Sequence, residues 1–121
     1  MPGGFTSAWA PSNDVTILGR AHPVVNRPNL ITDAEVDGWN SSTHGYLIDL
    51  PGSANNIIAH EPTGQPATAE FRLGSGCVLA TEQTLEWAWM RGYSHLLENS
   101  ILHPRCELAR IYLPLTLRSW P

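Results

Sequence analysis

The sequence has few cysteines and no long apolar run. Cys77 and Cys106 are too few for a disulfide framework and do not form a Cys-x-x-Cys pair, so we expect unpaired thiols without redox or metal chemistry. No stretch approaches the roughly 20 apolar residues of a membrane span. The first residues lack the basic and apolar regions of a signal peptide. These absences predict a soluble, cytoplasmic protein with no membrane partner.

Positive charge is also scarce. Seven Lys and Arg residues against eleven Asp and Glu give a formal charge of −4, and no basic cluster occurs before residue 104. Such a chain cannot neutralise many phosphates, so we do not expect a nucleic-acid partner. What the chain does have is apolar content of 42% with 15% charged residues, which is too apolar for a disordered segment. One folded domain is therefore expected.

Proline and glycine divide the chain into three parts. Residues 1–14 read as an N-terminal arm, residues 15–103 as a single α+β domain, and residues 104–121 as a C-terminal tail that forms an interface. No sequence repeat is present, which excludes solenoid and propeller arrays. The central range therefore carries the fold.

The local patterns predict the elements of that domain. Short apolar runs indicate strands at residues 15–18, 46–50, 56–60, 67–73 and 77–81. We expect the strands at 46–50 and 56–60 to pair across a turn, and those at 67–73 and 77–81 to form a hairpin around the glycines at 74 and 76.

Two helices are expected from their start and stop signals. Thr32 and Glu35 match a capping box, which predicts a short helix over 33–38. Thr81 is suited to cap a long helix that Pro104 ends, with Gly92 on its packing face. The predicted fold class is α+β: a small mixed or antiparallel sheet with a terminal β-hairpin and one long packed helix.

Several phrases of the sequence carry a family resemblance. In chain order they are Ala21-His22-Pro23-Val24, Asp37-Gly38-Trp39, Ser42-Thr43-His44-Gly45-Tyr46, Gly64-Gln65-Pro66-Ala67, Glu70-Phe71-Arg72-Leu73-Gly74-Ser75-Gly76 and Leu85-Glu86-Trp87. Together they resemble the C-terminal half of class I glutamine amidotransferase-like domains, in the branch that includes ThuA-like proteins, over about residues 14–102. The resemblance implies late strands, a terminal hairpin and the last helix of half a flavodoxin-like domain.

The resemblance implies no catalytic triad here. The family's nucleophilic cysteine lies in the N-terminal half, and Cys77 follows a hairpin turn instead. The family's His-x-Glu pair is absent too, because Glu61 follows His60 directly. Separately, residues 114–121 resemble the end of a reading frame that runs into the recombination site of an integron gene cassette. This implies a fragment carried in the mobile metagenome as a self-standing small protein.

His44 is the first candidate for a polar site. It stands in a run of hydroxyl residues that includes Ser42, and an imidazole beside hydroxyls can act as acid, base or ligand near neutral pH. Glu61 is a candidate carboxylate partner. The alternative is a histidine that only makes structural hydrogen bonds at the start of a strand.

Aromatic residues are the candidates for a ligand pocket or an interface: Trp39, Tyr46, Trp87 and Trp89. The alternative is that they fill the core. His22 and His60 lack a recurring ligand spacing with His44, so no metal and no cofactor is expected.

Three functions are compatible with these observations. The first is a non-catalytic binding or self-assembly module, a homo-oligomer that covers an exposed sheet edge. The second is a small hydrolase-like or ligand-binding enzyme that uses His44. The third is a subunit that docks on a protein partner completing the sheet.

Overall fold

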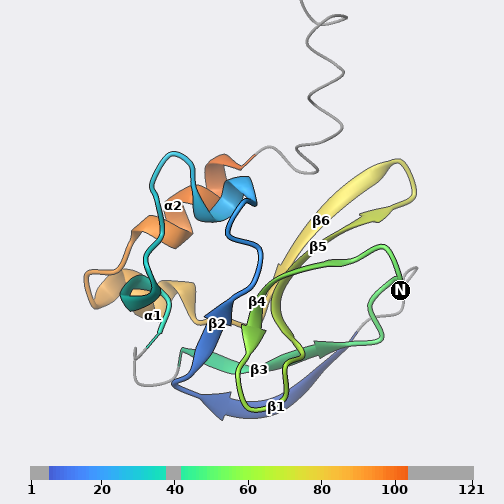
Figure 1. Ribbon diagram of the computed structural model, residues 1–121, viewed down its shortest axis with the longest axis horizontal. Helices are drawn as coiled ribbons and strands as arrows, with labels where there is room; N and C mark the ends of the chain where they lie inside the picture. The colour runs from blue at the N-terminus through green and yellow to red at the C-terminus, as the bar shows by residue number, and fades with distance from the viewer. Residues whose placement is uncertain (1–5, 38–41, 104–121) are drawn as a thin grey trace, which may run out of the picture.

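The computed structural model describes residues 6–37 and 42–103 and shows an α+β fold with two antiparallel sheets (Figure 1). The first sheet pairs β1 (Thr6–Ser12) with β3 (Thr43–Ile48). The second has the order β2-β4-β5-β6, with bounds Val15–Ile17, Asn55–His60, Pro66–Leu73 and Gly76–Thr81. The helical elements are the 3₁₀ turns η1 (Pro23–Val25) and η2 (Asp33–Glu35) and the α-helices α1 (Leu85–Met90) and α2 (His95–Leu102). The α+β class is confirmed.

The terminal hairpin is confirmed in detail. β5 and β6 pair in register from Thr68 opposite Thr81 to Leu73 opposite Gly76. Gly74 has a φ of 62°, a left-handed conformation that glycine adopts without steric cost. The relation to half of a flavodoxin-like domain stays a prediction. Doubly wound domains use a mostly parallel sheet, whereas the four strand pairings among the described residues are antiparallel, so the sheets give this relation no support.

The predicted pairing of residues 46–50 with 56–60 is wrong. β3 pairs with β1 inside the predicted N-terminal arm, with Ala8 opposite Tyr46, while β4 lies between β2 and β5. The physical reason is burial: Ile57 and Ile58 are fully buried, and a central strand covers them better than an edge strand.

The predicted single long helix is also wrong, because the chain forms two short helices instead. Gly92 has a φ of 92°, and Tyr93 N donates to Ala88 O at 2.8 Å, so the chain turns out of α1 there. α1 begins at Leu85 rather than next to Thr81, because Thr81 ends β6. Gly92 therefore serves to end a helix rather than to allow close packing.

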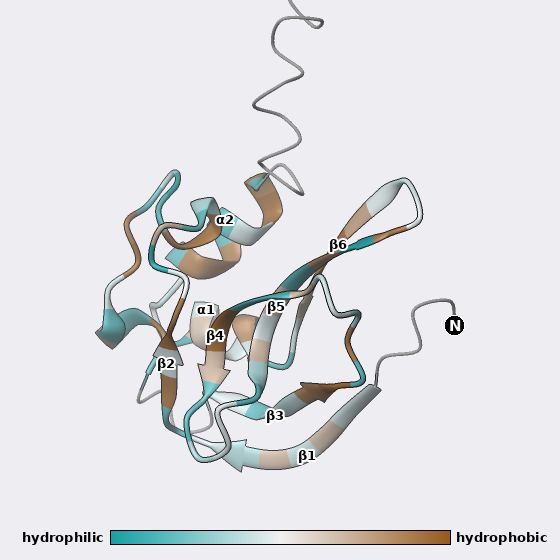
Figure 2. Cartoon of the chain, turned by 45° about the vertical axis from the view of Figure 1, so that its right-hand side comes forward, coloured by the Kyte–Doolittle hydropathy of each residue, from teal (hydrophilic) through white to brown (hydrophobic). Residues whose placement is uncertain are grey.

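The core lies between the four-stranded sheet and the helical elements (Figure 2). Its buried members are Val15, Ile17, Val24, Val25, Ile31, Val36, Ile57, Ile58, Ala67, Ala88 and Leu96. Asn99, also fully buried, links η1 to α2: its Nδ2 donates to Val24 O at 2.8 Å, and its Oδ1 accepts from Asn29 N at 3.0 Å. Apolar burial and one satisfied polar residue thus fix α2 beside η1.

Two further findings concern the chemistry of the chain. Cys77 is disulfide-bonded, so the expectation of unpaired thiols is wrong. The only other cysteine in the sequence, Cys106, lies outside the described residues, as does Trp39.

Within residues 6–37 and 42–103, no helix is long and apolar enough to cross a membrane.

The capping box at Thr32 is confirmed and gives a pH-dependent prediction. Thr32 N donates to Glu35 Oε2 at 2.9 Å, and His95 pairs with the same carboxylate. Burial raises the pKa of Glu35, but the bonds from the Thr32 backbone and His95 outweigh it, so the pKa lies below its usual value. The stabilisation is therefore present above the unfolded pKa of about 4.3 and is lost as the pH falls through the folded pKa.

We expect Glu35→Gln to lower the free energy of unfolding by about 1 kcal/mol at pH 7, a typical value for a lost cap. Urea denaturation measured from pH 7 to pH 3 should show the difference from the wild type shrinking below about pH 4.5. Glu86→Gln, at an exposed position of α1, is the control. A Glu35→Gln difference that is equal at pH 7 and pH 3 contradicts the prediction.

Candidate functional site

The structure places the three predicted polar residues in different surroundings. His44 is exposed on β3, and its ring lies against that of Trp9, with centroids 5.0 Å apart and the ring planes tilted by 39°. Ser42 is fully buried and donates to Asn13 O at 2.9 Å. Glu61 is exposed and accepts from Thr16 Oγ1 at 3.4 Å. Ser42 and Glu61 thus contact other parts of the chain, and His44 alone lies at a cleft.

The predicted aromatic residues are also separated. The ring of Tyr46 lies 5.1 Å from that of His60. Trp87 lines the same cleft as His44, with the Arg91 guanidinium 5.4 Å above its ring, whereas Trp89 is 60% exposed and lines a groove between α1 and α2. Trp87 is therefore the predicted aromatic residue that joins His44.

The cleft is open to solvent and has a volume of about 730 Å³. It lies where β3, the end of β6 and the two α-helices meet, because Thr43 forms a bridge with Gln83 and His44 N donates to Glu82 O at 2.9 Å. Its lining is His44, Thr81, Gln83, Thr84, Leu85, Glu86, Trp87 and Leu97.

Gln83 is the polar residue with the most defined geometry in this cleft. Its backbone N–H donates to Thr81 Oγ1 at 3.0 Å, and its side-chain Oε1 accepts from Thr68 Oγ1 at 2.8 Å. The hydroxyl oxygens of Thr81 and Thr68 lie 2.7 Å apart, so the three contacts form a closed ring. If Thr81 donates to Thr68, this closed ring uses every hydroxyl hydrogen. In this arrangement the amide oxygen of Gln83 faces Thr68, and Nε2 is the other end of the amide.

The other end of that amide is a buried donor. Gln83 is only 6% exposed, and its Nε2 has no hydrogen-bond partner among the described residues. A buried amide N–H without an acceptor costs free energy, and native structures rarely leave one unsatisfied. Gln83 thus contributes a buried, unpartnered amide nitrogen next to the lining of the cleft.

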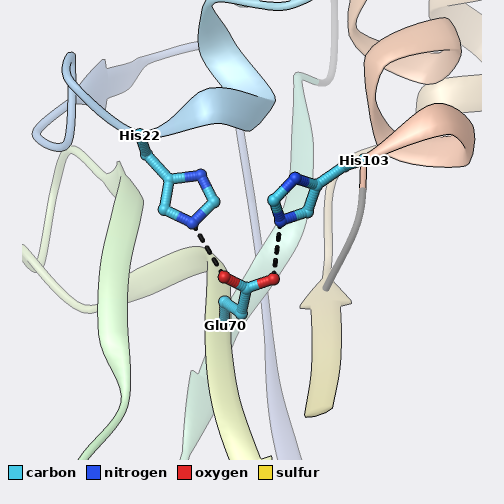
Figure 3. Close-up of side chains that lie close together, drawn as sticks. All are labelled: His22, Glu70 and His103. Carbon is cyan, nitrogen blue, oxygen red and sulfur yellow. Dashed lines mark hydrogen bonds and ion pairs between the residues drawn. The ribbon is translucent and has the colours of Figure 1, made fainter. Parts of the chain in front are cut away.

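A second polar cluster lies inside the protein (Figure 3). Glu70 on β5 accepts from two histidines: His22 Nε2 lies 2.9 Å from one carboxylate oxygen, and His103 Nε2 lies 2.7 Å from the other. All three side chains are at least 93% buried. The cluster joins three segments, since His22 caps η1 and His103 follows α2.

By residue type this cluster is a candidate metal centre, because its three ligand atoms lie within 4.8 Å of one another. The hydrogen bonds favour a different role. His22 Nδ1 accepts from Val24 N at 3.1 Å, so Nδ1 is unprotonated and the ring proton sits on Nε2, which donates to Glu70. A histidine that ligates through Nε2 normally carries its proton on Nδ1. The geometry therefore favours a hydrogen-bonded cluster that holds α2 to the sheet.

Sequence reasoning missed Gln83, Glu70 and His103. It considered His22 with His44 and His60, whereas the structure directs His60 to Ala10 O, at 2.9 Å, and His22 to Glu70. One signal was available: Glu70 is the sole acidic residue of β5, a mostly buried strand, and a carboxylate in such a strand needs partners. Gln83 gave no signal, because its surroundings come from distant segments.

No protein-family model, curated protein or solved structure matches the chain. The amidotransferase-like resemblance and the cassette origin therefore stay predictions, and the function is argued from the geometry above.

Proposed function

We propose that the chain is a non-catalytic binding module that takes up a small organic molecule in the cleft beside Gln83. The observation that carries the proposal is the cleft itself, a concave site of about 730 Å³ whose lining combines apolar side chains with the polar residues His44 and Gln83. Ligand sites are typically concave, mostly apolar and equipped with a few fixed polar groups. Here Leu85, Trp87 and Leu97 supply the apolar wall.

The surroundings of His44 support binding over catalysis. Among the described residues, no side chain hydrogen-bonds to the His44 ring, which instead lies against the tilted ring of Trp9. A histidine that acts as general base is usually held in its tautomer by a third group. The enzyme that uses His44 with Ser42 or Glu61 is therefore the less favoured alternative.

Trp87 and Trp89 provide a matched test on one helix. We expect saturation-transfer NMR with a set of small aromatic compounds to detect binders whose affinity falls at least tenfold in Trp87→Ala, because the variant removes the aromatic wall. The same binders should retain their affinity in Trp89→Ala. Binders that are insensitive to Trp87→Ala, or that are lost in Trp89→Ala, contradict the proposal.

We further propose that the chain forms a homodimer through the outer face of α1 and α2. Three apolar side chains that line the groove there are between 60% and 69% exposed: Trp89, Ile101 and Leu102. The acidic residue beside them, Glu98, is engaged by Asn29 Nδ2 at 2.6 Å. A second copy of the same face can cover these apolar side chains, and one isologous contact covers both copies.

Light scattering tests this second proposal. We expect the mass of a dimer for the wild type and of a monomer for Ile101→Asp, which places a charge in the apolar contact. Leu18→Asp, at an apolar position that is 55% exposed after β2, should remain a dimer. A monomeric wild type at high micromolar concentration would refute the proposed interface.

A further inference from the structure

We infer that the ligand of the cleft is an organic cation: an amine whose ammonium group lies at Glu86 and whose apolar body lies against Trp87. This inference rests on the proposed binding function and adds the charge of the ligand. It follows from three observations: a carboxylate in the lining without a cationic partner among the described residues, the negative charge of the chain, and an aromatic side chain on which a cation packs.

Glu86 sets the charge of the lining. Of the eight described residues that line the cleft, none is Lys or Arg, and Glu86 is the one acidic residue. It is exposed in the first turn of α1, and within residues 6–37 and 42–103 it takes part in no ion pair. An ammonium group forms charge-assisted hydrogen bonds with such a carboxylate, whereas an anion meets it as a like charge. The lining therefore favours a positively charged ligand.

Trp87 supplies the surface for the rest of the ligand. It lines the cleft with 39% of its surface exposed, and the guanidinium carbon of Arg91 lies 5.4 Å from the centre of its ring. The face of an aromatic ring is electron-rich and attracts cations, most strongly in Trp. Leu85 and Leu97 add apolar surface to the same lining. An amine with an apolar body can thus use the carboxylate and the wall together.

The charge of the whole chain acts in the same direction. The formal charge is −4, and a negative field raises the local concentration of cations and lowers that of anions. Salt screens exposed charges, with a Debye length of about 10 Å at 0.1 M. The affinity of a cation for the cleft should therefore fall as salt is added, whereas a neutral compound of the same shape should respond little.

Three compounds that share one ring and differ in charge test the inference. Benzylamine is a cation at pH 7, benzyl alcohol is neutral, and benzoate is an anion, the charge that the N-terminal end of α1 would favour. Each is titrated by NMR into the wild-type chain at low salt. We expect benzylamine to bind about fivefold more tightly than benzyl alcohol, as an exposed ion pair and a cation–π contact together allow, and benzoate to bind most weakly. Added salt should remove most of the difference.

Glu86→Gln locates the effect, because it keeps the shape of an exposed side chain and removes its charge. In this variant we expect the affinity of benzylamine to fall to within about twofold of that of benzyl alcohol, which itself stays unchanged. Glu61→Gln makes the same change of net charge at an exposed position outside the lining and is the matched control. A preference for benzylamine that survives Glu86→Gln, or that is lost equally in Glu61→Gln, overturns the inference.

The outcomes separate the inference from the proposed function. If benzyl alcohol or benzoate binds in the cleft as tightly as benzylamine, the cation class is overturned and the binding function stands. If none of the three shifts the resonances of His44 or Trp87 at millimolar concentration, both are overturned. The ranking in the wild-type chain depends on no variant, so it decides between these outcomes by itself.

Discussion

Gly45→Ala is expected to destabilise the fold by about 3 kcal/mol or more, at the upper end of the range for overpacked sites. A β-carbon on Gly45 would lie 1.7 Å from Ala8 O and 2.9 Å from Ala10 N, both backbone atoms that cannot turn aside. The added methyl group would push β1 away from β3 and break their pairing. Urea denaturation followed by circular dichroism measures the loss.

Gly52→Ala is the control for this prediction. A β-carbon at Gly52 meets nothing within 4 Å, so the change should stay within about 0.5 kcal/mol. Equal stability of the two variants would mean that β1 does not lie on β3 in solution, and would remove Trp9 from its place beside His44.

Glu70→Gln is expected to lower the free energy of unfolding by about 3 kcal/mol, because it disrupts two buried hydrogen bonds to a carboxylate. The carboxylate accepts from His22 and His103 at once, whereas an amide offers one oxygen and turns an N–H₂ group toward the other histidine. One buried ring nitrogen then faces a second donor. Glu61→Gln, on the surface after β4, should change stability by less than about 0.5 kcal/mol.

A loss below about 1 kcal/mol in Glu70→Gln would show that the carboxylate does not hold the two histidines together. Thermal unfolding with added Zn²⁺ gives a second view of the same cluster. A large rise in Tm for the wild type that is absent from Glu70→Gln would favour the metal centre over the hydrogen-bonded cluster.

Local chemistry explains what the sequence predicts well. The β5–β6 hairpin depends on glycines within its own turn, and the capping box depends on Thr32 and Glu35, three residues apart. The helix break at Gly92 is also local, but helical spacing around it masked the signal. A glycine among apolar residues at helical spacing can either let a second element pack closely or end the helix with a positive φ, and the sequence pattern does not distinguish these two roles.

The remaining features depend on contacts between distant segments. The partner of β3 is β1, because Gly45 leaves room for Ala8, and no short-range pattern reveals that match. The Glu70 cluster joins residues 22, 70 and 103, and the cleft joins His44 to Gln83 and Leu97. Of the predicted site residues, the structure brings together His44 and Trp87, which lie 43 positions apart in the sequence.

The most direct test of the ligand cleft is a ¹⁵N spectrum of the side-chain amides with and without benzylamine. The chain has two glutamines, so the exposed Gln65 amide is an internal reference for that of Gln83. We predict a saturable shift of the Gln83 amide resonances while those of Gln65 stay fixed. A fixed Gln83 amide, with shifts confined to Trp89 and Ile101 on the outer helical face, would contradict a ligand site in the cleft.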